Sequence, residues 1–596
     1  MRLIKPLAVS LAVLAAALAL VAGATAQDDE RIVLTVGTED VDTLNPLVGV
    51  EVPDYEAWNL QYATLTDKAA ADFATIPGLA ESWEASNDGK TYTYTLREGL
   101  EWSDGEPLTA DDVVFNVNTA REEEWLNYSS TTQNLTAKAI DERTVEITSS
   151  VPDPKLPTMD IYLLPEHIWG ALDAKQRPKY EAQDGVGSGP FTLAEYKSGQ
   201  FWRMVANPNY WNGEPAVDEV VFRIFNNADA MVAALKSGEI DAAQDVPAAS
   251  FEGLKTTEGI VAIEGQQGNV DEVSVNGGRP EDKRVEGIGN GHPALSDIEF
   301  RKAIAHAIDD QTIIERVNAG IGLPALTISP SPNPEWLPEI PVEEQFTFDL
   351  ERAKQLLEDA GYKDTDGNGV REMPGGGDDI NLVFAVRTDS QVAPPISEFV
   401  KGWLNDIGIG VTLKPMNESQ LTVVIGKGDY DLFHWSWTPY VDPDPMLSYF
   451  TCGQLSSDPD DPTNYYNDAN WCDPEYDRLY TEQNQELDRA KRVELVHQML
   501  RLMYDSATYN NLSQNPDLQA YRTDRFEGWV RQPAEVGPVI FSNTSPSYAI
   551  LTPIEGGGIN GGLSTAELAA LAIAGAAILA LAVVFLMRRR TTGERE

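Results

Sequence analysis

The sequence predicts an α/β fold with at least two lobes. Apolar residues recur at helical spacing in some segments and alternate with a period of two in others, and the two kinds of segment follow one another along the chain. Such alternation is typical of α/β architecture. A chain of 596 residues is too long for one hydrophobic core, so we expect more than one lobe.

The first clear elements are a strand and a capped helix. Residues 91–96 (TYTYTL) alternate with period two, and a turn follows at 97–99. Ser296 and Glu299 form a capping-box pattern, which predicts the start of a helix whose apolar face runs over 300–308.

Two more helices and a strand follow. One apolar face runs from Leu350 to Ala360 and ends at Gly361, a common helix-ending residue. A second face covers 396–407 and ends at Gly408. The alternating residues 409–413 come directly after it and predict a strand.

The N-terminus carries an export signal. Arg2 and Lys5 precede an apolar run, and the small residues Ala24-Thr25-Ala26 follow it. This order is typical of a secretory signal peptide, so we predict that residues 1–26 are cleaved.

The C-terminus carries a membrane signal. Residues 568–587 contain no charge and are long enough to span a bilayer as a helix. Arg588 to Arg590 follow and mark the cytoplasmic side. We expect a Gly-rich linker at 553–566, a transmembrane anchor at 567–588 and a cytoplasmic tail at 589–596, with the body on the extracellular face.

The composition excludes some partners. The formal net charge is −50, so the chain is not expected to bind nucleic acid or anionic lipid by charge. The acidity favours either cationic ligands or a solvated surface suited to high salt. The only two cysteines, Cys452 and Cys472, form a disulfide, remain free thiols or, least favoured, bind a metal.

No catalytic motif stands out. The sequence has no GxxxxGK[ST], GxSxG, HExxH or CxxC pattern, so we predict that the protein is not an enzyme and needs no cofactor or metal. Residues 364–369 (DTDGNG) begin like a calcium loop, but the twelfth position is Gly375 rather than a bidentate Glu. A polar turn is the favoured interpretation.

Several stretches resemble the extracellular solute-binding proteins of peptide and nickel ABC importers. They occur in the order and spacing of that family: LAESWE (79–84), DGKTYTYTLR (88–97), WSDGEPLTADDVVF (102–115), GSGPF (187–191), NPNYWNG (207–213), SGEID (237–241), FRKAIAHAID (300–309), GDYD (428–431) and DPDP (442–445).

The resemblance implies a periplasmic-binding-protein-like (Venus flytrap) fold of the large peptide-binding type. Two α/β lobes close on a ligand, and the chain crosses between them near residues 275 and 517. Lobe I would comprise 27–274 and a return segment, 518–552, and lobe II would comprise 275–517. The family's permease and ATPase are separate chains. Many bacterial relatives carry a lipid-anchored Cys after the signal; here Gln27 follows it, and the C-terminal helix would serve instead.

The resemblance also implies site residues. In dipeptide-binding members, an Asp in a Trp…Asp-Pro-Asp segment pairs with the peptide ammonium. Asp442 occupies that place, with Trp435 and Trp437 upstream as aromatic walls. The alternative is that Asp442 only initiates a turn and that the tryptophans belong to the core.

Three further assignments follow from the resemblance. Arg387 falls where relatives place a carboxylate-binding Arg, but the surrounding motif is broken, so a surface or interlobe ion pair is an equal alternative. Asn276, at the first crossing, is a candidate for hydrogen bonds to ligand backbone. Relatives often pair a Cys after the Trp…Asp-Pro-Asp segment with one in a Trp-Cys pair, which matches a Cys452–Cys472 disulfide.

The predicted function is capture of a peptide or related solute for an ABC importer. A sensor with the same fold, or a binder of oligosaccharide or nickel chelate, is the alternative.

Overall fold

The structure, a computed structural model, describes residues 31–49, 51–158, 161–462, 465–541, 544 and 546–554. The predicted signal peptide (1–26), anchor (567–588), cytoplasmic tail (589–596) and most of the linker lie outside these residues. Within the described ranges, no helix is both long enough and apolar enough to cross a membrane.

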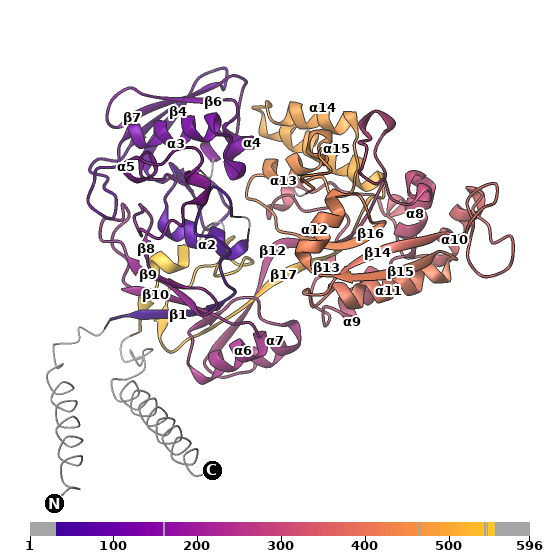
Figure 1. The fold of residues 1–596 in the computed structure, drawn as a ribbon. Coiled ribbons are helices and arrows are strands. Elements are labelled where there is room, and N and C mark those ends of the chain that lie inside the picture. The colour runs from indigo at the N-terminus through magenta and orange to yellow at the C-terminus, as the bar shows by residue number, and fades with distance from the viewer. Residues whose placement is uncertain are drawn as a thin grey trace, which may run out of the picture.

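Two long strands join the two lobes (Figure 1). β12 (Ile260–Val275) and β17 (Tyr509–Arg522) pair antiparallel, and their register shifts between Gly265 and Asn269. They stand in the middle of one sheet, so both lobes share its hydrogen bonding. The predicted crossings near 275 and 517 fall on these two strands, and the predicted two-lobe α/β fold is confirmed.

The shared sheet contains eleven strands in the part of the chain that the structure describes. On the lobe II side of β12 lie β16 (Leu432–Trp437), β14 (Asn381–Arg387) and β15 (Gly410–Met416). On the lobe I side of β17 lie β11 (Ala242–Ala243), β1 (Val33–Thr38), β10 (Glu219–Ile224), β9 (Phe201–Ala206) and β8 (Phe191–Lys197), while β13 (Leu323–Pro324) pairs with β17 off this path.

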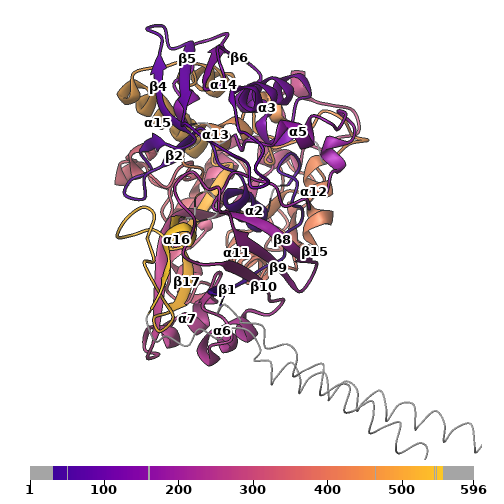
Figure 2. The same ribbon diagram turned by 90° about the vertical axis from the view of Figure 1, so that its left-hand side faces the viewer.

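Lobe I adds a second sheet at its far end, seen at the top of Figure 2. Its order is β4 (Ala80–Ala85), β5 (Thr91–Leu96), β7 (Thr144–Ser149) and β6 (Leu135–Ala139). The alternation predicted for 91–96 is confirmed, because Tyr92, Tyr94 and Leu96 point into the core. α3 (Ala110–Glu122) covers the sheet and is capped by Thr109. The longer of the other described helices in this lobe are α2 (Val52–Gln61), α6 (Ala228–Ser237) and α7 (Ala248–Lys255), and the short ones are α4 (Ser129–Thr132), α5 (Glu166–Trp169) and α16 (Pro546–Ile550).

Lobe II builds its first core from predicted helices. α10 (Leu350–Asp359) and α11 (Ala393–Asp406) pack against the sheet with α8 (Ile298–Ala307). Gly361 and Gly408 follow α10 and α11 with φ of 90° and 83°, which only glycine adopts without strain. The predicted Ser296 cap is wrong: the Asp297 carboxylate accepts from the Glu299 amide, whereas the Ser296 hydroxyl donates to the Pro293 carbonyl.

A second core of lobe II lies over the opposite face of β12 and β16. It is built by α13 (Asp444–Tyr449), α14 (Pro474–Gln483) and α15 (Arg489–Asp505), the orange elements of Figure 1. The predicted disulfide is confirmed: Cys452 and Cys472 are bonded, and their Cα atoms lie 4.8 Å apart. The bridge closes the segment between α13 and α14. α9 (Asp310–Arg316) and α12 (Glu418–Gly426) complete the lobe.

Candidate ligand-binding site between the lobes

A charged bridge connects the two lobes. Lys155, in the lobe I segment after β7, donates from Nζ to Asp444 Oδ2 at 2.9 Å and to Asn484 Oδ1 at 2.8 Å, both in lobe II. The Lys155 and Asp444 side chains are only 14% and 5% exposed. Burial lowers the pKa of Lys155, but Asp444 and Asp153 outweigh it and leave that pKa raised, so the ammonium stays charged.

Asp442 lies beside this bridge and is already paired. Arg492 of α15 donates to both of its oxygens, at 2.6 and 2.7 Å, and the Asp444 amide donates to Oδ1. Burial raises the pKa of Asp442, yet the guanidinium overcomes this and holds the pKa below its usual value. A ligand ammonium can therefore bind Asp442 only by displacing Arg492 or by sharing the carboxylate with it.

Aromatic residues gather where the lobes face each other. Tyr55 of α2 in lobe I lies against Tyr440 of lobe II, whose hydroxyl is 2.9 Å from that of Tyr449. The Tyr449 ring stacks on Tyr466, with centroids 4.6 Å apart, and lies 6.0 Å from the ring of Trp437. Trp437 thus contacts an aromatic cluster at the boundary and also packs against the second core of lobe II.

Arg387 ends β14 and is held by two carboxylates. Its Nε donates to Asp389 at 3.2 Å, and its Nη2 lies 2.9 Å from Glu418. The guanidinium also stands over the Trp435 ring, 5.5 Å from the centroid. Glu51 of lobe I lies close enough to Glu418 and Arg387 for their charges to shift its pKa. Burial and the charge of Glu418 raise the pKa of Glu51, whereas Arg387 lowers it.

Asn276 is fully buried, and its amide is used within lobe II. Its Nδ2 donates to the Tyr430 carbonyl at 3.0 Å, and its Oδ1 accepts from the Gly278 amide and from Asn470, each at 3.2 Å. Contact with ligand backbone would require these bonds to be exchanged.

Sequence reasoning missed a set of carboxylates at one edge of the lobe I sheet, which we call the acidic edge: Glu39, Asp245 and Asp517. Glu39 follows β1 and Asp245 follows the parallel neighbour β11, so both lie at the carboxyl ends of adjacent strands, where α/β sheets commonly bind ligands. Asp517 lies on the crossing strand β17.

The ionised forms of two carboxyl groups at the acidic edge, those of Asp245 and Asp517, are disfavoured. The Asp245 side chain is accessible to solvent, yet the surrounding protein raises its pKa to about 6, and Glu39 adds to the shift. Burial also raises the pKa of Asp517, helped by the charge of Asp245. The signal available in the sequence was an acidic residue within two positions of the end of each of two short strands.

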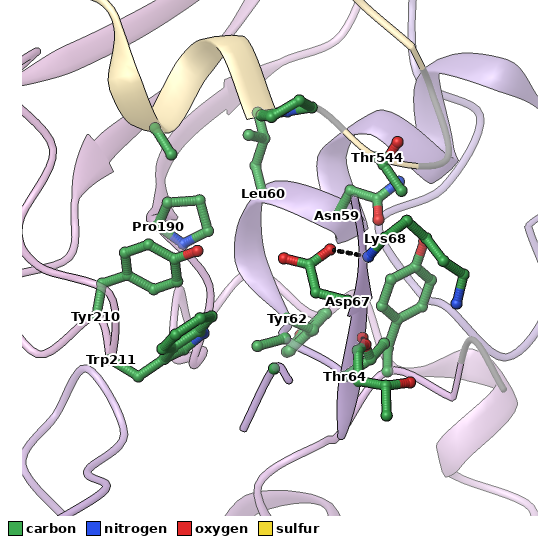
Figure 3. A pocket seen from close by; sticks show the side chains of 16 residues that line it. Asn59, Leu60, Tyr62, Thr64, Asp67, Lys68, Pro190, Tyr210, Trp211 and Thr544 are labelled. Carbon is green, nitrogen blue, oxygen red and sulfur yellow. Dashed lines mark hydrogen bonds between the residues drawn. The ribbon is translucent and has the colours of Figure 1, made fainter. Parts of the chain in front are cut away.

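Lobe I also contains a pocket of about 110 Å³ (Figure 3). Tyr210 and Trp211 line one side, Asp67 projects into the middle, and Tyr62 lies below it. Asp67 Oδ1 accepts from the Lys68 amide at 2.7 Å, and the Arg97 guanidinium stacks on Trp211 at 4.2 Å. Charges of both signs therefore surround this pocket.

The DTDGNG segment is a hydrogen-bonded turn. The Asp364 carboxylate accepts from the Gly367 and Gly369 amides, and Glu372 accepts from the Thr365 amide and hydroxyl. One oxygen from each of Asp364, Asp366 and Glu372 lies within 4.8 Å of the others, close enough for a cation, but the turn's own donors already bond to all three side chains.

Comparison with known proteins identifies relatives over most of the chain. The "Probable D,D-dipeptide-binding periplasmic protein DdpA" of Escherichia coli K12 is 26% identical over 512 residues, covering 83% of this chain and 90% of the relative. The "Dipeptide-binding protein" of the same organism is 25% identical, covering 84% and 92%.

Solved structures share the fold. The oligopeptide-binding protein AppA of Bacillus subtilis, in complex with a nonapeptide, gives a TM-score of 0.70 at 23% identity, covering 85% of this chain and 97% of that one. NikZ of Campylobacter jejuni, in complex with Ni(L-His), gives the same TM-score and coverage at 19% identity.

The family of bacterial extracellular solute-binding proteins, family 5, matches residues 74–458, well over half of the chain. The protein therefore belongs to this family of solute-binding proteins and is not an enzyme.

Proposed function

We propose that the protein captures a peptide or a related small solute between its lobes and delivers it to an ABC permease at the extracellular face of the cell membrane. The observation that supports this most directly is the set of interactions across the lobe boundary. Lys155, Tyr55 and Glu51 of lobe I each form a hydrogen bond or an electrostatic interaction with a residue of lobe II. A ligand that contacts both lobes stabilises the closed arrangement through its differential affinity.

The charges at the boundary suit a zwitterionic ligand. In the described part of the chain, the groups that shift the pKa values of Asp245 and Asp517 include no cation, and a ligand ammonium would supply the missing positive charge. Arg387 is half-buried and held by Glu418, so a ligand carboxylate can take the place of Glu418. Asp442 is a second possible ammonium site, with the displacement of Arg492 as its penalty.

Native mass spectrometry of the purified ectodomain, residues 27–562, tests the ligand class. A peptide released on denaturation supports the proposal. Release of a sugar or a nickel chelate would change the proposed class of ligand but would leave capture by lobe closure in place. Small-angle scattering with the identified ligand should then show a smaller radius of gyration. Tight binding without compaction contradicts capture by closure and favours a sensor with a rigid cleft.

The tether is a separate part of the proposal. Residues 567–588 are long and apolar enough to span a bilayer, and no Cys lies near the predicted cleavage site, where Gln27 follows Ala26. A stop codon after Gly562 should release folded protein into the medium, while the full chain stays with membranes through a high-salt wash, because salt does not screen hydrophobic insertion. A truncated protein that pellets with membranes and begins at Met1 assigns the anchor to an uncleaved signal segment instead.

A further inference from the structure

Two buried carboxyl groups in lobe II have no cationic partner among the residues that the structure describes. Glu272, on β12, is fully buried, and Asp468, in the loop closed by the disulfide, is 6% exposed. One oxygen of each, Glu272 Oε2 and Asp468 Oδ1, makes no hydrogen bond. Buried charges are ordinarily paired or bound to a metal, so this arrangement requires an explanation.

The donors around the pair are neutral. The Ser274 hydroxyl donates to Glu272 Oε1 at 2.5 Å. The Trp437 indole lies beside Glu272 and the Tyr509 hydroxyl beside Asp468, but neither N–H nor O–H reaches hydrogen-bond geometry. These groups can orient a carboxyl, but they cannot neutralise it.

The charged and titratable groups on the neighbouring elements do not neutralise it either. On β12, Asp271 adds a further negative charge and lies 3.7 Å from His434 of β16. Arg279 donates to Asn470 and to the Ser456 carbonyl rather than to either carboxyl. The phenols of Tyr430, Tyr465 and Tyr509 also lie near Asp468, and burial and the charge of Asp468 raise their pKa values.

We propose that Glu272 and Asp468 form a proton-binding site and hold at least one proton between them at neutral pH, as a permanent part of the folded lobe. The surroundings agree with this: burial raises the pKa of Glu272 to about 7, and burial together with the charge of Glu272 raises the pKa of Asp468 well above its usual range. Two neighbouring carboxyl groups away from water do not both ionise easily, because their negative charges repel each other. Ionisation of one carboxyl therefore favours retention of the proton on the other.

The site lies directly behind the boundary between the lobes. The ring of Trp437 packs edge-on against Phe450, 5.5 Å away, and Phe450 packs against Tyr509 at 5.0 Å. Loss of the shared proton would place two negative charges under these rings. The inference concerns the folded lobe and stands whether or not the proposed ligand is correct.

The test compares the pH dependence of folding in matched variants. Between pH 5 and 7 the unfolded chain releases these protons while the native state keeps them, so the folding equilibrium constant should fall by up to tenfold more per pH unit in the wild type than in Glu272→Gln. Asp468→Asn should show the same weaker pH dependence as Glu272→Gln. Both variants should be at least as stable as the wild type at pH 8.

Glu372→Gln is the control, because Glu372 is buried in the same lobe but is hydrogen-bonded by Thr365, which lowers its pKa against the opposing effect of burial. This variant should lose stability above pH 5. Infrared spectra of the wild type at pH 7 should contain a protonated-carboxyl band that weakens in Glu272→Gln or in Asp468→Asn. An unchanged pH slope and an unchanged band in both variants overturn the proposal. A wild-type stability that depends on EDTA or on replacing sodium by tetramethylammonium, with no such dependence in Glu272→Gln, identifies a metal or alkali ion and also overturns it.

Discussion

Two groups of buried acids in lobe II differ in whether a cationic side chain lies beside them. Asp442 and Asp444 stand beside Arg492 and Lys155, and the guanidinium keeps the pKa of Asp442 below its usual value despite burial. Glu272 and Asp468 are buried too but have only neutral donors among the described residues, and their pKa values are raised. The partner, more than the burial, therefore decides the charge of each acid.

The difference also separates two roles. The compensated group crosses the lobe boundary through Lys155, so its charges can contribute to closing the molecule. The uncompensated pair, Glu272 and Asp468, lies within one lobe behind Trp437. Its protonation state is expected to change the stability of that lobe directly and ligand binding only indirectly. Each prediction below removes one partner from one of these groups.

The largest effect is expected for Arg492→Met. This change leaves Asp442, whose side chain is 17% exposed, without its cation, and breaking such a pair should destabilise the protein by about 3–5 kcal/mol. Chemical denaturation at pH 7 measures the change. Asp442→Leu combined with Arg492→Met should recover much of the loss, because no lone charge then remains.

Arg489→Met, on the same helix, is the control for this prediction. Its guanidinium is 64% exposed and pairs with Glu335, so the loss should stay within about 1 kcal/mol. Equal losses for Arg489→Met and Arg492→Met would show that the Asp442 pair is no stronger than a surface pair.

The next effect concerns the disulfide, which closes the loop that carries Asp468. Cys452 and Cys472 are 20 residues apart, and a loop of this length predicts about 3 kcal/mol of stabilisation by chain entropy. The double Ser variant should lose that amount and should also show a weaker pH dependence, because Asp468 is held less firmly near Glu272. Unchanged stability with two thiols detected in the native wild type would contradict the bridge.

The local elements could be predicted from the sequence because each depends on its own residues. The alternation at 91–96 and the helix-ending Gly361 and Gly408 need no knowledge of the rest of the chain. The partners of the acids could not be predicted in this way. Asp442 meets Arg492 and Glu272 meets Asp468 only because α15 and the disulfide loop pack over β12 and β16.

The resemblance to the family predicted the two lobes and suggested a site at Asp442, but it did not predict the charged partner of that residue. Asp442 stays a predicted ligand-binding residue, and nothing in its own segment indicates that an Arg some 50 residues later donates to both of its oxygens. The acidic edge was missed for the same reason: Asp245 and Asp517 become neighbours only through strand pairing near the crossing.

Glu56 extends the comparison to lobe I. It is buried and accepts from the Tyr548 hydroxyl at 2.6 Å and from Gln244 at 2.7 Å, both neutral, and burial raises its pKa to about 7. A raised acid pKa gives stability that is complete below pH 4.5 and is lost as the pH rises to 7, by roughly 2–3 kcal/mol. Glu56→Gln should flatten that part of the thermal stability profile. A variant that is less stable than the wild type at pH 8 would mean that the carboxylate is favoured in the fold.

The smallest effect is expected for Lys155→Met, which removes the cation of the interlobe bridge. Asp444 keeps a bond from Gln483 at 3.1 Å, and water can reach its carboxylate once the lobes separate, so the loss should be only about 1–2 kcal/mol. The change should instead shift the ligand-free ectodomain toward a larger radius of gyration in small-angle scattering. Lys175→Met, an exposed lysine of the same lobe, should leave the radius unchanged. If both variants scatter like the wild type, the bridge does not hold the lobes together, and closure depends on the aromatic contacts of Tyr55 and on the ligand.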